Sequence, residues 1–113
     1  MVTRTVKRGL DIREIEVTVA PSFLDYKIII IPRSQRSFFP GYKKDFILKT
    51  NLREYLAHMT SAEGDIKIGD PSAGSYICGR LGTWFEHNRV DIGDTLRVSE
   101  LEHHRIYRLR LMR

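Results

Sequence analysis

The chain has 113 residues, 42% of them hydrophobic and 29% charged, and its 19 basic and 14 acidic side chains give a formal net charge of +5. This length suits one domain, residues 1–113, with one hydrophobic core, and leaves no room for a second domain. The longest aliphatic run, residues 28–31, is far shorter than the roughly 20 residues of a membrane-spanning helix, and no apolar stretch follows a basic start, so we expect neither membrane insertion nor secretion.

The first third of the chain predicts two strands. We expect residues 1–12 to be flexible, and the apolar and polar alternation over residues 15–19 predicts a half-buried strand that ends at Pro21. Residues 26–31 are mostly β-branched and apolar, which is typical of a strand buried on both faces at the centre of a sheet. Pro32 ends this strand because proline has no amide hydrogen to donate.

The next segment predicts a short helical turn followed by a third strand. The turn covers residues 33–39, and we expect Phe38 and Phe39 to close the core. Pro40-Gly41 then turns the chain toward a strand at residues 46–48.

Residues 51–64 fit two local structures. Their apolar residues recur at helical spacing, at Leu52, Tyr55, Leu56 and Met59. This spacing favours a helix. The same segment also alternates as a strand, with Tyr55, Ala57 and Met59 facing inward, so local pattern does not decide between the two.

The last part of the chain predicts a helix between strands. Residues 75–78 indicate a short strand, and an apolar stripe of Leu81, Trp84 and Phe85 predicts a helix over residues 79–88. We expect Asn88 to end this helix in a left-handed conformation and the two aromatic residues to lie in the core. Two closing strands follow the Gly93-Asp94 turn, around residues 96–98 and 106–111.

The usual signatures of catalysis are missing from the sequence. His103 and His104 are adjacent, whereas two ligands of one metal on a helix stand three or four residues apart, and no cysteine or carboxylate cluster accompanies them at ligand spacing. Residues 79–82 lack the lysine and hydroxyl of a phosphate-binding loop. The one cysteine, Cys78, cannot form an internal disulfide and suits a reducing compartment. We therefore expect a cytoplasmic, non-catalytic protein that needs no cofactor and no metal.

Basic side chains concentrate in two segments. Residues 26–49 contain six basic side chains and one acidic one, and residues 105–113 contain four arginines and no acid. Such clustering fits a face that binds a polyanion. Ordinary solvated surface charge explains the same counts equally well.

Several sequence landmarks follow one another in a fixed order. The first half contains Val19-Ala20-Pro21-Ser22, Ile30-Ile31-Pro32-Arg33 and Phe38-Phe39-Pro40. The second half contains Ser72-Ala73-Gly74-Ser75-Tyr76-Ile77, Leu81-Gly82-Thr83-Trp84-Phe85, and a stretch from Asn88 to Val98 that includes Gly93-Asp94. Together they resemble the B-three-type DNA-binding pseudobarrel domain of plant transcription factors and the related recognition domains of bacterial restriction endonucleases. The resemblance covers residues 15–111, and the longer stretch between Tyr55 and Ser75 makes the bacterial domains the closer comparison.

This resemblance implies a mainly β fold, namely a seven-stranded open pseudobarrel with two short helices, in which residues 53–60 form a strand. It also implies sequence-specific binding of double-stranded DNA through two loop arms that enter the major groove. The first arm is residues 21–27 and the second is residues 69–75. The implied partners are duplex DNA and a nuclease domain or subunit that the domain directs.

The resemblance further implies which residues contact DNA. Candidates for base or backbone contacts in the two arms are Ser22, Asp25, Tyr26, Lys27, Asp70, Ser72, Ala73 and Ser75. Candidates for specificity after the second strand are Arg33, Gln35 and Arg36. Asp25 suits cytosine, Lys27 suits guanine or phosphate, and Ala73 suits a thymine methyl group. Candidates for phosphate neutralisation are Lys43, Lys44, Lys49 and Lys67.

Each candidate also has a structural interpretation. Tyr26 would begin a buried strand, Asp70 would form a turn with the following proline, and Lys43 with Lys44 would keep a sheet edge soluble. The alternative function is a β-barrel protein-interaction module that binds no nucleic acid. A small hydrolase is a third interpretation, although no acid and base pair is identifiable for it.

Overall fold

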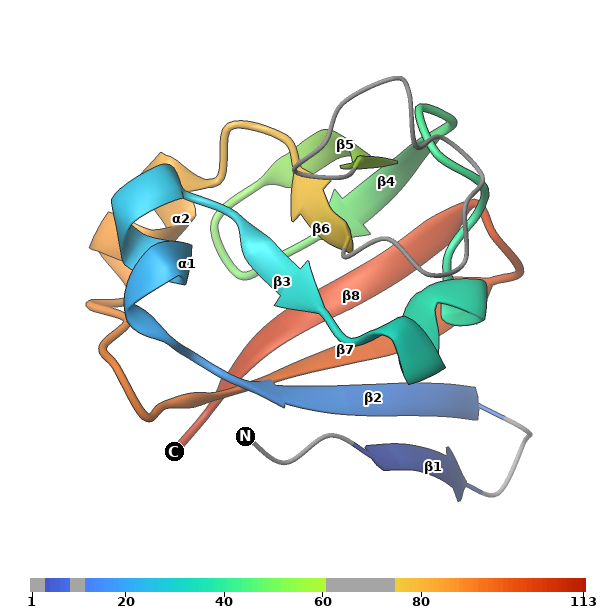
Figure 1. Cartoon of the computed structure of the whole chain (residues 1–113), viewed down its shortest axis with the longest axis horizontal. Coiled ribbons are helices and arrows are strands. Elements are labelled where there is room, and N and C mark those ends of the chain that lie inside the picture. The colour runs from blue at the N-terminus through green and yellow to red at the C-terminus, as the bar shows by residue number, and fades with distance from the viewer. Residues whose placement is uncertain (1–3, 9–11, 61–74) are drawn as a thin grey trace.

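The computed structural model describes residues 4–8, 12–60 and 75–113, which form eight strands and three short helices (Figure 1). In chain order the elements are β1 (Arg4–Arg8), β2 (Ile12–Thr18), α1 (Pro21–Tyr26), β3 (Ile29–Ile31), η1 (Arg33–Phe38), β4 (Asp45–Lys49), β5 (Glu54–Thr60), β6 (Ser75–Cys78), α2 (Gly82–His87), β7 (Thr95–Glu102) and β8 (Ile106–Met112). Of these, η1 is a 3-10 helix. Among the described residues, no helix reaches the length and hydrophobicity that crossing a bilayer requires.

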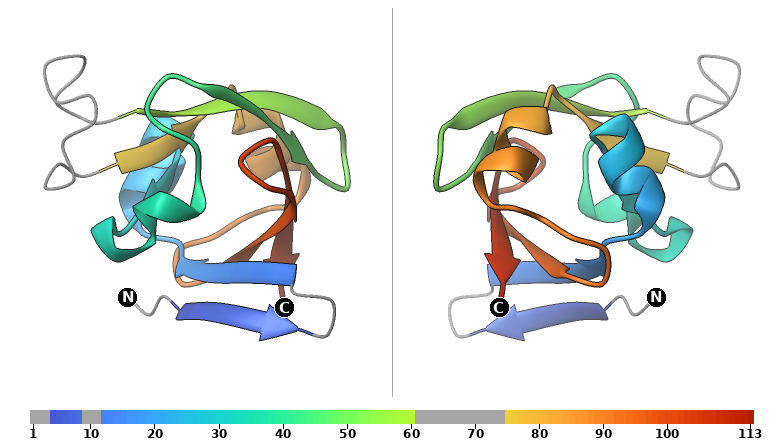
Figure 2. Two further views of the ribbon diagram at one scale, coloured as in Figure 1. Left: turned by 90° about the vertical axis from the view of Figure 1, so that its right-hand side faces the viewer. Right: turned by 90° about the vertical axis from the view of Figure 1, so that its left-hand side faces the viewer.

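Within the described ranges, the strands form one sheet in the order β1-β2-β7-β8-β4-β5-β6-β3. Neighbouring strands are antiparallel except β4 and β8, which are parallel. The seven strands from β2 to β8 curl into a nearly closed barrel, and β1 adds to the sheet beyond β2 (Figure 1 and Figure 2). The predicted mainly β, seven-stranded open barrel is therefore confirmed. Strand β1 and helix α1 are additions that the sequence did not predict.

An aromatic cluster closes one end of the barrel interior. Phe38, Phe39, Phe46 and Tyr107 pack with ring centroids between 4.9 and 5.6 Å apart. All four side chains are buried, which confirms the predicted core role of the two phenylalanines at the end of η1. Burial of large aromatic side chains contributes strongly to stability, about 3–5 kcal/mol when one is truncated to alanine.

Helix α2 packs on the core through Trp84 and Phe85, as predicted, and both side chains are buried. The indole Nε1 of Trp84 donates to Asn51 Oδ1 at 2.9 Å, so the turn between β4 and β5 is tied to the helix. The amide of Asn88 donates to the Trp84 carbonyl oxygen at 2.9 Å. The prediction that Asn88 is left-handed is wrong, because its side chain caps the helix from a right-handed backbone and Arg89 takes the positive φ of 51°.

Residues 54–60 form strand β5, as the resemblance implies, and not the helix that local spacing favours. The Thr50 hydroxyl accepts hydrogen bonds from the amides of Leu52 and Arg53 and so closes a turn before the strand. Tyr55 and Met59 then face the barrel and are buried, while Leu56 is 65% exposed. Pairing with β4 and β6 stabilises the strand beyond any local helical preference.

Residues 21–26 form helix α1, whereas the sequence predicts a loop arm there and a strand from Tyr26. Pro21 presets the backbone of the first helical turn, and Phe23 is fully buried beneath the helix. Lys27 ends the helix in a left-handed conformation with φ 58°, and its amide donates to the Phe23 carbonyl oxygen. The segment predicted as the first arm therefore contains a short helix, whose Phe23 side chain packs in the core.

Strand β3 is also shorter than predicted and lies at the end of the sheet order, not at its centre. The isoleucine run at residues 28–31 therefore does not mark a central strand. Ile29 and Ile31 fill the barrel interior, while Ile30 is half-buried and packs against the edge of the core.

Candidate nucleic-acid interface

Strands β3, β6 and β5 are consecutive in the sheet, and each presents one face to the barrel interior and one outward. Ile29 and Ile77 point inward and are fully buried. Ile30, which follows Ile29, and Tyr76, which precedes Ile77, are half-buried and point to the other side of the sheet. The outer surface of these three strands is called the three-strand face below.

A groove of about 620 Å³ lies between α1 and the three-strand face. Residues that line it include Ser22 and Tyr26 of α1, Ile30 of β3, and Ser75, Tyr76 and Cys78 of β6. The Tyr26 side chain is 72% exposed, so its ring is open to a partner molecule. The groove brings the first-arm candidates Ser22 and Tyr26 to the same place as Ser75, where the predicted second arm ends.

Lys27 and Asp25 are exposed beside this groove. The aliphatic part of Lys27 lies against the start of α2, because a Cβ atom added at Gly82 would be 3.5 Å from Lys27 Cγ. The left-handed backbone of Lys27 is uncommon for a residue with a side chain. It directs the lysine along the end of the three-strand face that adjoins α2.

A second hollow of about 600 Å³ lies over β5 and the end of β6. Arg53, Leu56, His58 and Arg80 are among its lining residues. The Arg53 guanidinium lies over the Tyr55 ring at 5.1 Å from its centroid, and the Tyr55 hydroxyl is 2.6 Å from Thr83 Oγ1. Cys78 lines the first groove and this hollow alike, so the two share a wall on β6.

A basic cluster occupies the opposite end of the three-strand face. It consists of Arg33, Arg36, Lys43 and Lys44 from η1 and the following turn. The Arg36 guanidinium lies over the Tyr42 ring at 5.1 Å, while Arg33 and Lys44 are exposed. Gln35, the remaining candidate on η1, is half-buried.

Hydrogen bonds fix the basic cluster beside the ends of β5 and β6. The Lys43 amide donates to the Met59 carbonyl oxygen at 2.8 Å. Ile31, just before η1, pairs with Ser75, the first residue of β6. The cluster therefore flanks Thr60 and Ser75, between which lie the candidates Lys67, Asp70, Ser72 and Ala73, outside the described residues.

Ser75 and Lys49 have internal partners that limit any contact with DNA. Ser75 is buried, and its hydroxyl donates to the Ile31 carbonyl oxygen at 3.4 Å. Lys49 Nζ lies 3.8 Å from a Glu54 carboxylate oxygen. Ser75 therefore links β6 to β3, and the charge of Lys49 is partly offset by Glu54 within the sheet.

The basic tail is largely neutralised by intramolecular ion pairs. Arg110 contacts the buried Glu14 carboxylate at 3.1 Å, and Arg113 contacts Asp94 at 3.0 Å. Arg105 contacts Glu102 at 3.3 Å. By contrast, Lys27, Arg33 and Lys44 form no ion pair within the part of the chain that the structure describes. Of the two basic segments in the sequence, the one over residues 26–49 therefore supplies more uncompensated charge.

Arg53 and Arg80 also lie at the three-strand face, although the sequence did not predict them as site residues. Arg53 precedes β5 and Arg80 follows β6, so antiparallel pairing brings both to the end of the face that adjoins α2. The strand alternation of residues 54–60 is the signal that would have placed them. No protein family matches this chain, and no curated protein matches it.

Proposed function

We propose that this protein binds duplex DNA in a sequence-specific manner through the three-strand face, and that it serves as the recognition domain of a nuclease or as a small DNA-binding protein. The observation that carries the proposal is the distribution of uncompensated basic charge. It lies at both ends of the three-strand face, at Lys27, Arg53 and Arg80 beside α2 and at Arg33 and Lys44 beside η1.

The spacing of these two basic groups matches a feature of B-DNA. Strand β6 lies between Arg80 and the basic cluster and has four residues, so it is about 13 Å long at about 3.3 Å per residue, whereas Arg53 lies farther out, before the seven-residue strand β5. The major groove is about 12 Å wide. We infer that Arg80 at one end of the face and the basic cluster at the other contact phosphates on the two sides of one groove, with the strands over its opening.

Three exposed groups at the two ends of the face are suited to base edges and sugars. Tyr26 presents an exposed ring and hydroxyl, and Asp25 presents a carboxylate that accepts from the cytosine amino group. Arg33 is exposed and carries the guanidinium that pairs with guanine through two hydrogen bonds. Phosphate contacts fix the register and these groups supply the discrimination.

Fluorescence anisotropy with labelled random duplex, measured at several salt concentrations, tests the proposal. The logarithm of the association constant should fall linearly with the logarithm of the salt concentration, with a slope of about −0.9 for each phosphate that the protein neutralises. Selection from a randomised duplex pool should then enrich one short sequence. Absence of binding at low salt contradicts the proposal, and binding without enrichment contradicts its sequence-specific part.

A second candidate, a protein-interaction module, is favoured by the exposed apolar side chains of the same face. Tyr26 and Leu56 are 72% and 65% exposed, and each lines one of the two hollows that meet at Cys78, where an apolar partner group could bind. This function predicts that duplex DNA does not bind at low salt. The anisotropy experiment therefore separates the two candidates.

A further inference from the structure

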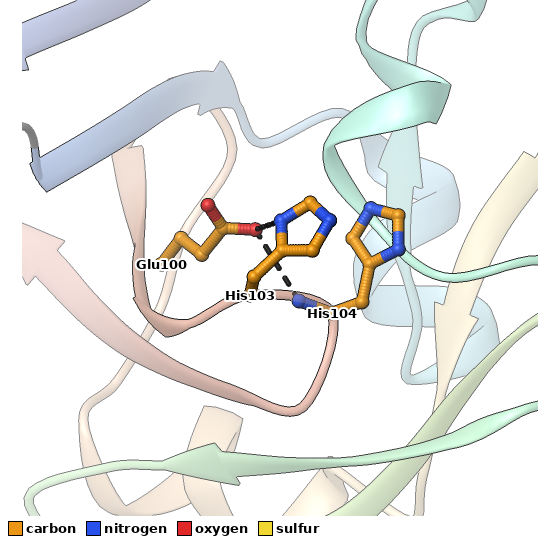
Figure 3. A group of neighbouring side chains, drawn as sticks. All are labelled: Glu100, His103 and His104. Atoms are coloured by element: carbon orange, nitrogen blue, oxygen red, sulfur yellow. Dashed lines mark hydrogen bonds and ion pairs between the residues drawn. The ribbon is translucent and has the colours of Figure 1, made fainter.

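The hairpin turn between β7 and β8 gathers three side chains that can each donate one ligand atom to a metal ion. Glu100, His103 and His104 hold these atoms within 4.8 Å of one another (Figure 3). A register shift between Glu100 and Glu102 interrupts the ladder just before the turn. His104 adopts a left-handed backbone with φ 55°. These two irregularities bring the carboxylate and the adjacent histidines together, which sequence spacing alone does not indicate.

The Glu100 side chain is held in place beside the two imidazoles. One carboxylate oxygen, Oε2, lies 3.3 Å from His103 Nδ1 and accepts from the His104 amide at 3.4 Å. The other oxygen, Oε1, lies 3.9 Å from the Arg13 guanidinium. Glu100 is only 10% exposed, so it is held by its neighbours, and the oxygen nearer the histidines is the one that a metal ion would use.

A hydrogen bond holds the His104 ring in place beside His103. Its Nε2 lies 3.2 Å from the Ser37 carbonyl oxygen, and a carbonyl oxygen can only accept, so Nε2 carries the hydrogen. Nδ1 is therefore the nitrogen with a free lone pair in the neutral ring. Figure 3 shows this nitrogen on the side of the ring that faces away from Glu100 and His103, so the His104 side chain has to turn before it can bind an ion that the other two share.

His103 supplies the third ligand atom. The two imidazole rings stack with centroids 3.9 Å apart at 19°, so their in-plane lone pairs do not yet converge. His103 is 71% exposed, so its side chain has room to turn toward a shared ion while its Nδ1 starts 3.3 Å from Glu100 Oε2. Zinc binds nitrogen at about 2.0–2.1 Å and favours imidazole and carboxylate donors with water in an open position.

We propose that Glu100, His103 and His104 form a Zn²⁺ site that closes the β7–β8 turn. Coordination uses Glu100 Oε2 and one ring nitrogen of each histidine, with water completing the tetrahedron. The site does not depend on the proposed DNA-binding function, so either can fail alone.

Titration of the full chain with Zn²⁺ against a chromophoric chelator tests the site. One ion should bind per chain and raise the thermal midpoint, and EDTA should reverse the rise. His103→Ala should weaken binding by at least tenfold, and because this side chain is exposed, the fold should be unaffected. Glu100→Gln should weaken binding similarly, with circular dichroism to verify folding. The matched control is His87→Ala, an exposed histidine on α2 outside the cluster, which should leave the affinity unchanged.

Two results overturn the proposal. One is the absence of binding at millimolar Zn²⁺. The other is binding that His103→Ala leaves unchanged, because the ion then lies elsewhere. Chemical shift changes of the His103 and His104 rings on addition of Zn²⁺ provide an independent readout, and they should appear at these two rings before any other.

Discussion

The Tyr107 hydroxyl donates a 2.6 Å hydrogen bond to the carbonyl oxygen of Phe38. This contact joins strand β8 to the end of η1, the helix that carries Arg33 and Arg36. Tyr107 is fully buried, and burial raises the pKa of its hydroxyl well above the ordinary value, with the nearby Glu100 carboxylate adding to the effect. The hydroxyl therefore remains a protonated donor across the physiological range and fixes the position of the basic cluster.

Removal of this donor should destabilise the protein. Tyr107→Phe leaves the Phe38 carbonyl oxygen without its partner in the core and should lower the free energy of unfolding by about 1–3 kcal/mol. Urea denaturation followed by fluorescence measures the change. Tyr42→Phe is the matched control, because the buried Tyr42 hydroxyl has no hydrogen-bond partner in the described structure. Its loss should leave stability unchanged or raise it, and equal losses in the two variants would contradict this account.

Gly79 should not tolerate a side chain. A Cβ atom at this position would lie 2.9 Å from the Leu56 carbonyl oxygen and 3.0 Å from Ala57 Cβ. Both neighbours belong to a paired strand that cannot shift freely, so Gly79→Ala should lower stability by about 1–3 kcal/mol. Gly41→Ala is the control, since nothing lies within 4 Å of its Cβ position. Equal thermal midpoints for the two variants would show that β5 and the end of β6 are not packed this closely.

Asp94 should make folding sensitive to acid. The Asp91 amide, which donates to Asp94 Oδ2 at 2.9 Å, and then the Arg113 guanidinium hold the pKa of Asp94 below its ordinary value, against a smaller opposing effect of burial. A carboxyl with a lowered folded-state pKa contributes stability that is present above its unfolded value, about 3.9, and is lost as the pH falls through the folded value. Asp94→Asn should therefore flatten the stability curve below about pH 4. Unfolding free energies measured between neutral and acidic pH test this, and a curve parallel to that of the unaltered protein would refute it.

Individual basic residues should differ in their effect on DNA binding. Arg33→Ala and Lys44→Ala should each weaken binding to the duplex, and a variant that loses one phosphate contact should reduce the salt slope by about one. If Arg33 contacts a base, its replacement should cost about 1–3 kcal/mol and relax discrimination at one base pair. Arg105→Ala, which removes a charge already paired with Glu102, is the control and should leave affinity unchanged. Equal effects of all three variants would indicate a response to net charge alone.

The strands of the barrel were largely predictable because their side chains alternate and their ends carry turn residues. Residues 75–78 and the Trp84 and Phe85 stripe are examples in which the local pattern and the tertiary structure agree. Residues 54–60 are different, because helical and strand spacing coincide there and pairing with β4 and β6 decides the outcome. Strand β1 was missed because its pairing with β2 depends on partners that lie outside its own sequence pattern.

The candidate site was predictable in part. Tyr26 and Arg33 are exposed beside the three-strand face, and their role as contact residues stays a prediction, while the helix that carries Tyr26 was not expected. Arg110 and Arg113 illustrate the limit of charge counting, because their carboxylate partners are Glu14 and Asp94, far away in the sequence. Which basic residues remain uncompensated follows only from the folded structure.

The most direct test of the central claim is a ¹H–¹⁵N NMR titration of the protein with duplex DNA. The account predicts that amide shifts concentrate at the three-strand face and its two basic ends, including Lys27, Arg33, Tyr76 and Arg80. Residues around the Glu14 and Arg110 ion pair on β2 and β8 should not shift. Changes confined to that side, or no change on addition of DNA at low salt, would contradict the account.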